Sequence, residues 1–278
     1  MNNNIQARTP TRRKRPPQKK YNKTGRLLLV MAVASLLAIL VIFIVGFIIG
    51  YRYITVKTDD GTIKYFGTVD ATGMLKKGTL YFSNGNKGLV DGKKSTITYT
   101  NGDVYTGGLS QLQKNGEGTL KYKNGDVYEG GFKDNQFSGK GVFKYKNGDV
   151  YEGEYKEGLM DGEGKYTWSD GSSYEGEFKA NKRNGLGKFT ITDSSYYEGS
   201  YVNDAKEGKG KYVFENGDVY EGDYKADIRT GKGTYTWANG ECYTGDFVNN
   251  DMHGYGKYTW PSGRVYEGKF HQGKIVVE

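Results

Sequence analysis

The sequence predicts an all-β repeat array, an elongated, twisted, antiparallel single-layer sheet of β-hairpins preceded by one transmembrane α-helix. Three observations predict it: tyrosines that recur every 23 residues, alternation of apolar and polar residues between them, and one uncharged apolar stretch near the N-terminus. A fixed period of tens of residues is typical of repeat arrays. The recurring tyrosines are Tyr105, Tyr128, Tyr151, Tyr174, Tyr197, Tyr220, Tyr243 and Tyr266.

Residues 1–26 form a basic N-terminal segment. They include nine Lys or Arg residues and no acidic residue, and we expect a disordered cytoplasmic tail. The chain has 40 basic residues, and nine of them lie in this tail. The remaining 31 basic residues nearly balance the 32 acidic residues, so the net charge of +8 comes from the tail. The charge therefore indicates membrane topology rather than nucleic-acid binding. The cluster from Arg12 to Lys20 would also suit anionic lipid at the inner leaflet.

Residues 27–51 are expected to form a transmembrane helix. The stretch from Leu27 to Gly50 has no charge over 24 residues, which is enough to span a hydrocarbon core of about 30 Å. A cleaved signal peptide is the rival interpretation, but the run is longer than a typical signal-peptide core and no A-x-A-like site stands at its end. Since the basic residues precede the span, the N-terminus is expected in the cytoplasm and the repeats outside the plasma (cytoplasmic) membrane.

Residues 52–104 are expected to form degenerate hairpins. Tyr65, Gly67, Gly78 and the dipeptide Asn84-Gly85 have the spacing of the later repeats. A shortened copy with Gly88, Val90, Ile97, Tyr99 and Asn101-Gly102 links them to Tyr105.

In residues 105–278 each repeat contains two alternating runs. Tyr151, Gly153 and Tyr155 would share one face of a strand, with polar residues between them. A second alternating run follows the pair Gly162 and Gly164, so each repeat is expected to be two antiparallel strands. Two strands at about 4.8 Å give roughly 10 Å of advance per repeat, and the whole array would extend over about 80 to 100 Å.

Most repeats end in a turn dipeptide, usually Asn-Gly, as in Asn147-Gly148. Asn-Gly between two alternating runs is a strong hairpin signal, because both residues of a two-residue hairpin turn need positive φ. The exception is Asp193-Ser194, where we expect a looser turn or another type.

The block from Tyr151 to Tyr155, with Gly162, Gly164 and the closing Asp170-Gly171, resembles the MORN (membrane occupation and recognition nexus) repeat. The resemblance covers residues 105–278 as seven 23-residue repeats plus a C-terminal partial repeat and cap. It implies a β-hairpin array that serves as a scaffold or in binding. MORN arrays also accompany lipid kinases and methyltransferases, but no residue pattern in this chain supports such an activity.

The residues that could suggest an active site recur with the repeat. The G-x-G pieces precede strands and not helices, which favours a structural role over a phosphate loop. His253, His271 and Cys242 have no metal-ligand spacing, and no Ser-His-acid set is indicated. We therefore predict no enzyme, no cofactor and no metal. The recurring carboxylates are expected on a solvent-facing strand face: Glu129, Glu152, Glu175, Glu198, Glu221 and Glu267.

Two surfaces are predicted to bind partners. The first is an edge formed by variable loops between the two strands of each repeat, with the candidates Phe137, Leu159, Met160, Arg183, Ile228, Arg229 and Met252. Tolerated variation would equally explain these loops. The second is an aromatic groove with the candidates Tyr166, Trp168, Tyr235, Trp237, Tyr258 and Trp260. Packing of the ribbon on itself is favoured for most of these rings, and the binding groove is the alternative.

The functional hypothesis is a membrane-anchored scaffold that presents a protein-binding ribbon outside the cytoplasmic membrane, to a partner protein or a second copy of the chain. Two alternatives stay open: a binder of membrane lipid or envelope glycan, and an accessory subunit of an enzyme.

Overall fold

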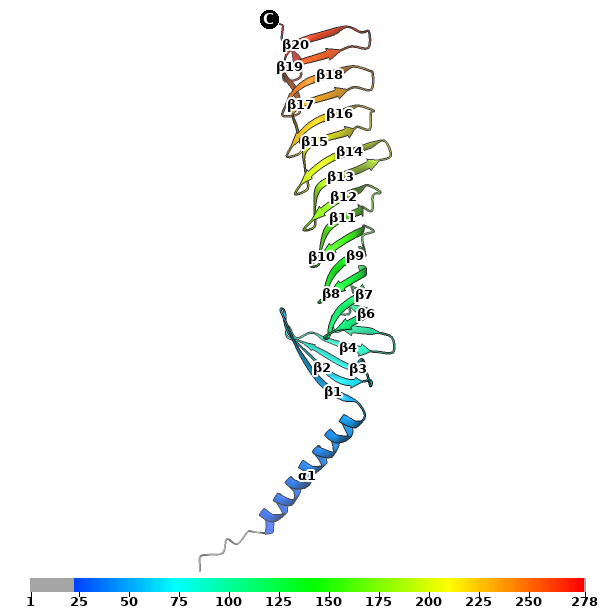
Figure 1. The fold of residues 1–278 in the computed structure, drawn as a ribbon, viewed down its shortest axis with the longest axis vertical. Helices are drawn as coiled ribbons and strands as arrows, with labels where there is room; N and C mark the ends of the chain where they lie inside the picture. The colour runs from blue at the N-terminus through cyan, green and yellow to red at the C-terminus, as the bar shows by residue number, and fades with distance from the viewer. Residues whose placement is uncertain (1–22, 278) are drawn as a thin grey trace, which may run out of the picture. The chain divides into compact units, whose positions relative to one another are not determined.

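The computed structural model describes residues 23–277 and divides into a helical unit that ends at Tyr51 and a sheet unit that begins at Arg52. In the sheet unit the strands follow one another in chain order (Figure 1). The strands are β1 (Tyr51–Thr58), β2 (Gly61–Val69), β3 (Leu75–Phe82), β4 (Lys87–Asp91), β5 (Thr96–Tyr99), β6 (Val104–Ser110), β7 (Gln113–Lys121), β8 (Val127–Lys133), β9 (Gln136–Lys144), β10 (Val150–Lys156), β11 (Leu159–Thr167), β12 (Ser173–Lys179), β13 (Lys182–Thr192), β14 (Ser195–Val202), β15 (Ala205–Val213), β16 (Val219–Lys225), β17 (Ile228–Thr236), β18 (Cys242–Val248), β19 (Asp251–Thr259), β20 (Val265–His271) and β21 (Lys274–Ile275).

Helix α1 (Lys23–Ile48) begins four residues before the predicted apolar span and ends three residues before the predicted end. Polar residues before the apolar stretch continue the helix, so the prediction of disorder was wrong for residues 23–26, and residues 1–22 lie outside the described residues. The helix ends where Gly50, at φ 91°, donates its N–H to the carbonyl of Phe47. α1 is long and apolar enough to cross a membrane, a property that signal sequences share.

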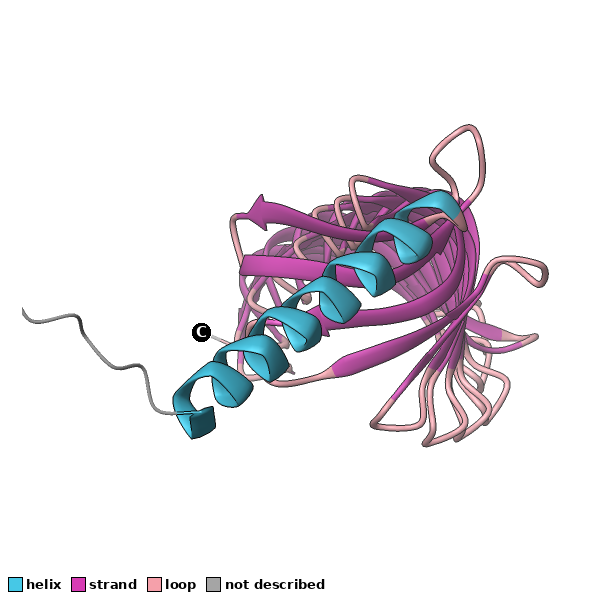
Figure 2. Cartoon of the chain, turned by 90° about the horizontal axis from the view of Figure 1, so that it is seen from below, coloured by secondary structure: helices cyan, strands magenta, loops and turns pink. Residues whose placement is uncertain are grey.

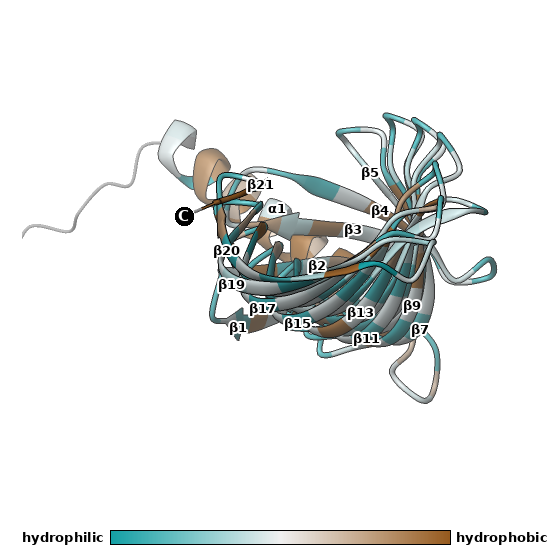
Figure 3. Cartoon of the chain, turned by 90° about the horizontal axis from the view of Figure 1, so that it is seen from above, coloured by the Kyte–Doolittle hydropathy of each residue, from teal (hydrophilic) through white to brown (hydrophobic). Residues whose placement is uncertain are grey.

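The sheet unit is one 21-stranded sheet in which each strand from β2 onward pairs antiparallel with the next, and β1 pairs with β2. This confirms the predicted all-β hairpin array. The strands curve along their length, and the turns gather in rows along the sheet (Figure 2). Hydrophobic residues form narrow bands on the strands, whereas much of α1 is hydrophobic (Figure 3).

The two faces of the sheet differ as the alternation predicts. On β10, Tyr151 and Tyr155 are buried, whereas Glu152 and Glu154 are exposed. We call the face that carries the tyrosines the aromatic side and the opposite face the charged side.

From Tyr105 to Tyr243, each recurring tyrosine lies over a pair of glycines. Gly153 and Gly164 are opposite each other on β10 and β11, and a Cβ atom at Gly164 would lie 2.7 Å from Cζ of Tyr151. The Tyr151 hydroxyl donates to the carbonyl oxygen of Glu154 at 3.1 Å. The glycines therefore leave the space that the ring fills. The tyrosines with no exposed surface are Tyr65, Tyr105, Tyr128, Tyr151, Tyr174, Tyr197, Tyr220 and Tyr243.

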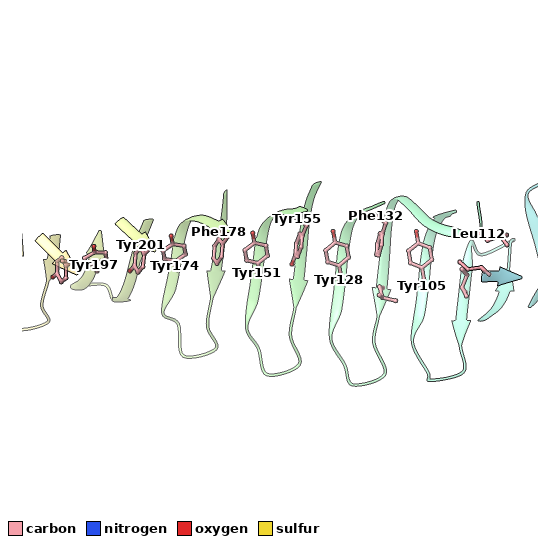
Figure 4. Close-up of a cluster of buried hydrophobic side chains, with 14 of the residues drawn as sticks. Tyr105, Leu112, Tyr128, Phe132, Tyr151, Tyr155, Tyr174, Phe178, Tyr197 and Tyr201 are labelled. Atoms are coloured by element: carbon pink, nitrogen blue, oxygen red, sulfur yellow. The ribbon is translucent and has the colours of Figure 1, made fainter. Parts of the chain in front are cut away.

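Aromatic rings join neighbouring hairpins into one continuous core. Tyr151 packs edge to face against Tyr155 of its own strand, at 5.2 Å between ring centroids, and against Phe178 of the next repeat, at 5.1 Å. Figure 4 shows the same alternation along several repeats. We call this series the tyrosine ladder. Each hairpin thus completes the burial of its tyrosine with a ring from the next one.

The turn type predicted for Asn-Gly was wrong. In Asn147-Gly148 only the glycine has positive φ (98°), and the Gly148 N–H donates to the carbonyl of Tyr145 at 3.0 Å. This pattern is a three-residue loop with a bulge, which needs one left-handed residue instead of two. Turns with two left-handed residues lie at the other end of the hairpins, as at Asn203 (φ 49°) and Asp204 (φ 74°).

The exceptional turn at Asp193-Ser194 is of another type, as predicted. Thr192 and Ser195 pair directly across it, and neither turn residue has positive φ. The pairing shifts between Thr190 and Thr192, so a bulge absorbs the missing turn residue.

Side chains at both rows of turns cap the neighbouring repeat. The Asp149 carboxylate accepts the N–H of Ser169 at 2.9 Å, and this bond holds the pKa of Asp149 below its ordinary value. At the opposite row, Oδ1 of Asn181 accepts the N–H of Met160 at 2.8 Å. Both bonds link residues about one repeat apart, so each turn depends on an adjacent hairpin.

The weaker copies upstream of Tyr105 have the same construction. Tyr65 donates to the carbonyl of Thr68 at 2.8 Å, and Gly67 lies opposite Gly78. In the shortened copy the buried residues Val90 and Ile97 face each other. The ladder geometry therefore begins well before the first strong repeat.

One buried hydroxyl in the ladder has no hydrogen-bond partner within the described residues, that of Tyr201. Four other copies of the repeat, the C-terminal partial one included, have phenylalanine at this column, for example Phe178. We expect Tyr201→Phe to raise the free energy of unfolding by about 1 kcal/mol, because it removes an unsatisfied polar group. Tyr197→Phe is the matched control and should lower it by about 1 kcal/mol, because its hydroxyl donates to the carbonyl of Ser200. Chemical denaturation of the full chain measures both, and a loss of stability in Tyr201→Phe would contradict the assignment.

Candidate binding surfaces

The aromatic side forms a trough between the two rows of turns. A cavity of about 460 Å³ on this side is lined by Asn101 and Asp103 near one row and by Asn135 and Gly158 at the other. Residues from opposite ends of the strands can line one cavity only if the strands bend toward it. The aromatic side is therefore the inside of the bend.

A column of long side chains crosses the trough, one from each repeat. We call it the bridging column: Lys114, Phe137, Met160, Arg183, Lys206, Arg229 and Met252. Phe137 stacks on Tyr128 at 3.8 Å between ring centroids. The Arg183 guanidinium lies 5.0 Å from the Tyr201 ring centroid, and Lys206 Nζ lies 5.2 Å from that of Tyr197. These side chains cover the tyrosine ladder with apolar and cation–π contacts.

The predicted loop edge was wrong as a description of structure. Its seven candidates lie in strands, because each connecting turn has only two residues, as at Asp134-Asn135 between β8 and β9. Five of them belong to the bridging column and are half-buried, whereas Leu159 and Ile228 are exposed on the charged side, where they pair with Lys156 and Lys225. A partner-binding role for these residues stays a prediction.

The predicted aromatic groove residues do lie together on the aromatic side. Tyr166 and Trp168 are 4.6 Å apart, Tyr235 and Trp237 are 4.6 Å apart, and the row continues from Trp237 to Tyr258 at 5.3 Å. All six candidates are half-buried, so the rings pack on the ladder and also reach the surface.

The outermost aromatic residue of each repeat forms a row along one row of turns. We call it the outer aromatic row: Phe82, Tyr99, Tyr122, Tyr145, Trp168, Phe214, Trp237 and Trp260. Ile191 occupies the position between Trp168 and Phe214, in the repeat with the exceptional turn. The row is thus divided into two blocks.

Hydrogen-bond donors in the outer aromatic row have no acceptor within residues 23–277. They are the hydroxyls of Tyr99, Tyr122 and Tyr145 and the indole N–H groups of Trp168, Trp237 and Trp260. Burial, with the nearby carboxylates of Asp103 and Asp126, raises the pKa of Tyr122 to about 12. Burial likewise raises the pKa of Tyr99 and Tyr145. A tyrosine phenol is protonated at neutral pH even at its ordinary pKa, so these hydroxyls can donate.

The charged side carries an alternating ladder of charges across seven strands. The directly paired residues are Glu152, Lys165, Glu175, Lys188, Glu198, Lys211 and Glu221. All are exposed, which confirms the predicted solvent-facing carboxylates, and the Lys165–Glu175 pair is 3.8 Å apart. A shallow groove of about 900 Å³ crosses this side over the glycine pairs. Opposite charges directly across neighbouring strands are favourable, although only Lys165 and Glu175 lie within 4 Å of each other among the described pairs of this ladder.

A third cavity, of about 550 Å³, lies in the degenerate hairpins and is mainly apolar. Ile54, Val56, Leu75 and Leu112 line it, together with Asp91. Within the described residues there is no group of three His, Cys, Asp or Glu side chains placed to hold a metal ion. The rings of His253 and His271 are 5.0 Å apart and tilted to each other, and no third ligand is placed beside them within the described residues.

The repeated hairpin matches the model of the MORN repeat seven times, at residues 105–127, 128–150, 151–173, 174–196, 197–219, 220–242 and 243–263. The chain belongs to the MORN repeat family. These matches confirm the seven predicted MORN repeats, and the repeat is a non-catalytic type. No curated protein sequence matches the chain.

Solved structures resemble this MORN array only distantly. The TCP domain of SAS-4 (dCPAP) of Drosophila melanogaster, in complex with a proline-rich motif of Ana2 (dSTIL), is 16% identical, with a TM-score of 0.36 over 56% of this chain and 85% of that one. The TCP10 domain of Danio rerio CPAP, in complex with a peptide of Danio rerio STIL, is 15% identical, with a TM-score of 0.36 over 79% and 100%.

The bridging column and the unpaired donors were missed at the sequence level. Alignment of the MORN repeats on Tyr105 puts Lys114, Arg183, Lys206 and Arg229 in one column, and this alignment could have revealed it. The unpaired donors could not be predicted from the sequence, because only the folded structure shows which hydroxyl and indole N–H groups lack acceptors.

Proposed function

We propose that this chain is a membrane-anchored MORN-repeat scaffold that binds a protein partner along its outer aromatic row, outside the cytoplasmic membrane. We propose no catalytic activity, no cofactor and no nucleic-acid partner for the chain.

The outer aromatic row carries the proposal. Trp168 and Trp237 each combine a half-buried ring with an N–H group that has no acceptor within residues 23–277. Aromatic residues of this kind, apolar in body and polar at the tip, are enriched in protein interfaces. The tyrosine ladder, by contrast, is closed by its own neighbours and offers no surface to a ligand.

The anchor part of the proposal is supported by α1 and by its flanking charges. α1 has the length and composition of a membrane span, and basic residues without acidic ones precede it. Positive charge is retained on the cytoplasmic side, so the repeats would face outward.

Photo-crosslinking in intact cells tests both parts. A benzoylphenylalanine placed at Trp168 should form a discrete protein adduct, and the same group placed at Glu175 on the charged side should not. Protease added outside the cells should remove the adduct, because the proposal places the repeats there. Failure to form any protein adduct at residue 168 would refute binding along the row, and an adduct protected until the cells are lysed would refute the topology.

The alternative of lipid or glycan binding is an outcome of the same experiment. Crosslinks from residue 168 to lipid or carbohydrate alone would favour it over a protein partner.

A further inference from the structure

We propose that the N-terminal block of the outer aromatic row binds a proline-rich segment of a partner protein in the polyproline II conformation, with a basic residue beside its prolines. This rests on the proposed function and names the class of its partner. Phe82, Tyr99 and Tyr122 line the site, together with Lys114.

The advance of the hairpin backbone is close to one turn of a polyproline II helix. Two strands advance about 9.6 Å. A polyproline II helix rises about 3.1 Å per residue with three residues per turn, which gives about 9.3 Å per turn. The rings do not follow this spacing throughout, because Phe82 and Tyr99 are 5.9 Å apart between centroids. We therefore assign the ligand to the opening between Tyr99 and Tyr122 and not to the whole row.

The hydrogen-bonding groups of the site are complementary to proline. The hydroxyls of Tyr99 and Tyr122 and the ammonium group of Lys114 are donors without acceptors in the described part of the chain. A proline residue has a carbonyl acceptor and no N–H, and the carbonyls of a polyproline II helix are not bonded internally. Such a segment can accept from the site without leaving a donor of its own unpaired.

The cavity lies where the row opens. Phe82 and Tyr99 are 5.9 Å apart between centroids, but within the described residues Tyr99 makes no ring contact with Tyr122. The cavity of about 460 Å³ is lined by both tyrosines, with Leu120 and Phe137 at its apolar part. Aromatic-lined grooves of this kind hold the flat, preformed surface of a polyproline II helix.

The charge of the cavity favours a basic residue in the ligand. Asp60 and Asp103 line it against a single cation, Lys114. The Asp103 carboxylate accepts from Asn101 and from the N–H of Lys123, whereas Asp60 has no cation within 4 Å among the described residues. Lys114 Nζ lies 5.5 Å from the Tyr99 ring centroid and is held over the rings. The excess negative charge is thus complementary to a Lys or Arg beside the prolines.

A peptide-binding measurement on the full chain in lipid nanodiscs tests the polyproline inference. The probe is a labelled peptide of twelve prolines followed by one arginine. We expect saturable binding that weakens about fivefold in Tyr122→Phe, which removes one donor but keeps the ring. Tyr255→Phe on the charged side is the matched control and should bind as the parent does, because Tyr255 is 64% exposed and distant from the cavity in the chain. The Tyr122 hydroxyl has no partner in the described fold, so this variant should unfold at the same temperature as the parent.

A helical peptide and a Gly-Ser peptide of equal length and charge separate the outcomes. If they bind as well as the proline peptide, or if Tyr122→Phe binds unchanged, the polyproline inference is overturned while peptide binding by the scaffold stands. No binding of the proline peptide, with a protein adduct still formed at residue 168, also overturns this inference alone. Absence of both the peptide complex and the adduct would overturn the proposed function as well.

Discussion

Gly164→Ala is expected to lower the free energy of unfolding by about 3 kcal/mol, although it adds a single methyl group. The new Cβ would lie 2.7 Å from Cζ of Tyr151, a ring with no exposed surface. The ring cannot move away, because Tyr155 and Phe178 pack against it and its hydroxyl is bonded to the carbonyl of Glu154. Chemical denaturation of the full chain in nanodiscs, followed by tyrosine and tryptophan fluorescence, measures the loss.

Gly171→Asn is the matched control for this prediction. Gly171 has φ 90° in a turn, and a Cβ there would meet nothing within 4 Å. Asparagine tolerates the left-handed region, so we expect a cost of less than about 1 kcal/mol. Equal losses at the two positions would show that the glycines serve the backbone conformation and not the space for the tyrosine ring.

Tyr174→Ala should destabilise the array by about 3 to 5 kcal/mol, which is the range for a buried aromatic cut back to alanine. Tyr174 has no exposed surface and packs edge to face against Phe178 at 5.1 Å and Tyr201 at 5.3 Å. Because each repeat contacts only its neighbours, hydrogen exchange should accelerate in β12 to β15 and remain slow in the distant hairpins.

Tyr196→Ala is the control for the ladder position. Tyr196 is half-buried on the charged side, where Lys188 Nζ lies 4.2 Å from its ring centroid. Loss of this contact should cost about 1 kcal/mol or less. If hydrogen exchange in Tyr174→Ala instead accelerated uniformly over all the strands, the sheet would unfold as one unit and the nearest-neighbour description would be wrong.

The sheet was predictable because its main determinant is local and repeated. Tyr151, Gly153 and Tyr155 are spaced by two, so their shared face follows from strand geometry alone. The pairing of Gly153 with Gly164 also follows once two strands per repeat are recognised. The family assignment rests on the same columns.

The turns were not predictable with the same certainty, because their type depends on where the pairing shifts. A bulge between Gly153 and Tyr155 changes the count of residues that remain for the turn at Glu157 and Gly158. Sequence shows the total number of residues and not how they divide between bulge and turn. For this reason Phe137 and Met160, expected in loops, lie in strands and pack over the aromatic core.

The candidate site was predicted only in part, and the reason lies in the bending of the strands. Trp168 and Trp237 were recognised from alternation, and they do lie on the aromatic side. Lys114 reaches Tyr99 across the trough because the strands bend. The residue pattern of a single repeat does not predict this bending.

The way in which rings are shared between hairpins has a consequence for synthesis. Tyr105 is buried in part by Phe132, which leaves the ribosome 27 residues later, and Tyr243 waits in the same way for Phe270. At about 5 to 20 residues per second, this delay amounts to roughly one to five seconds per repeat. During that time the newest hairpin exposes an uncovered tyrosine, while every earlier hairpin is already closed. Folding would then advance as a front one repeat behind the growing chain, and a nascent array would never expose more than one unfinished hairpin.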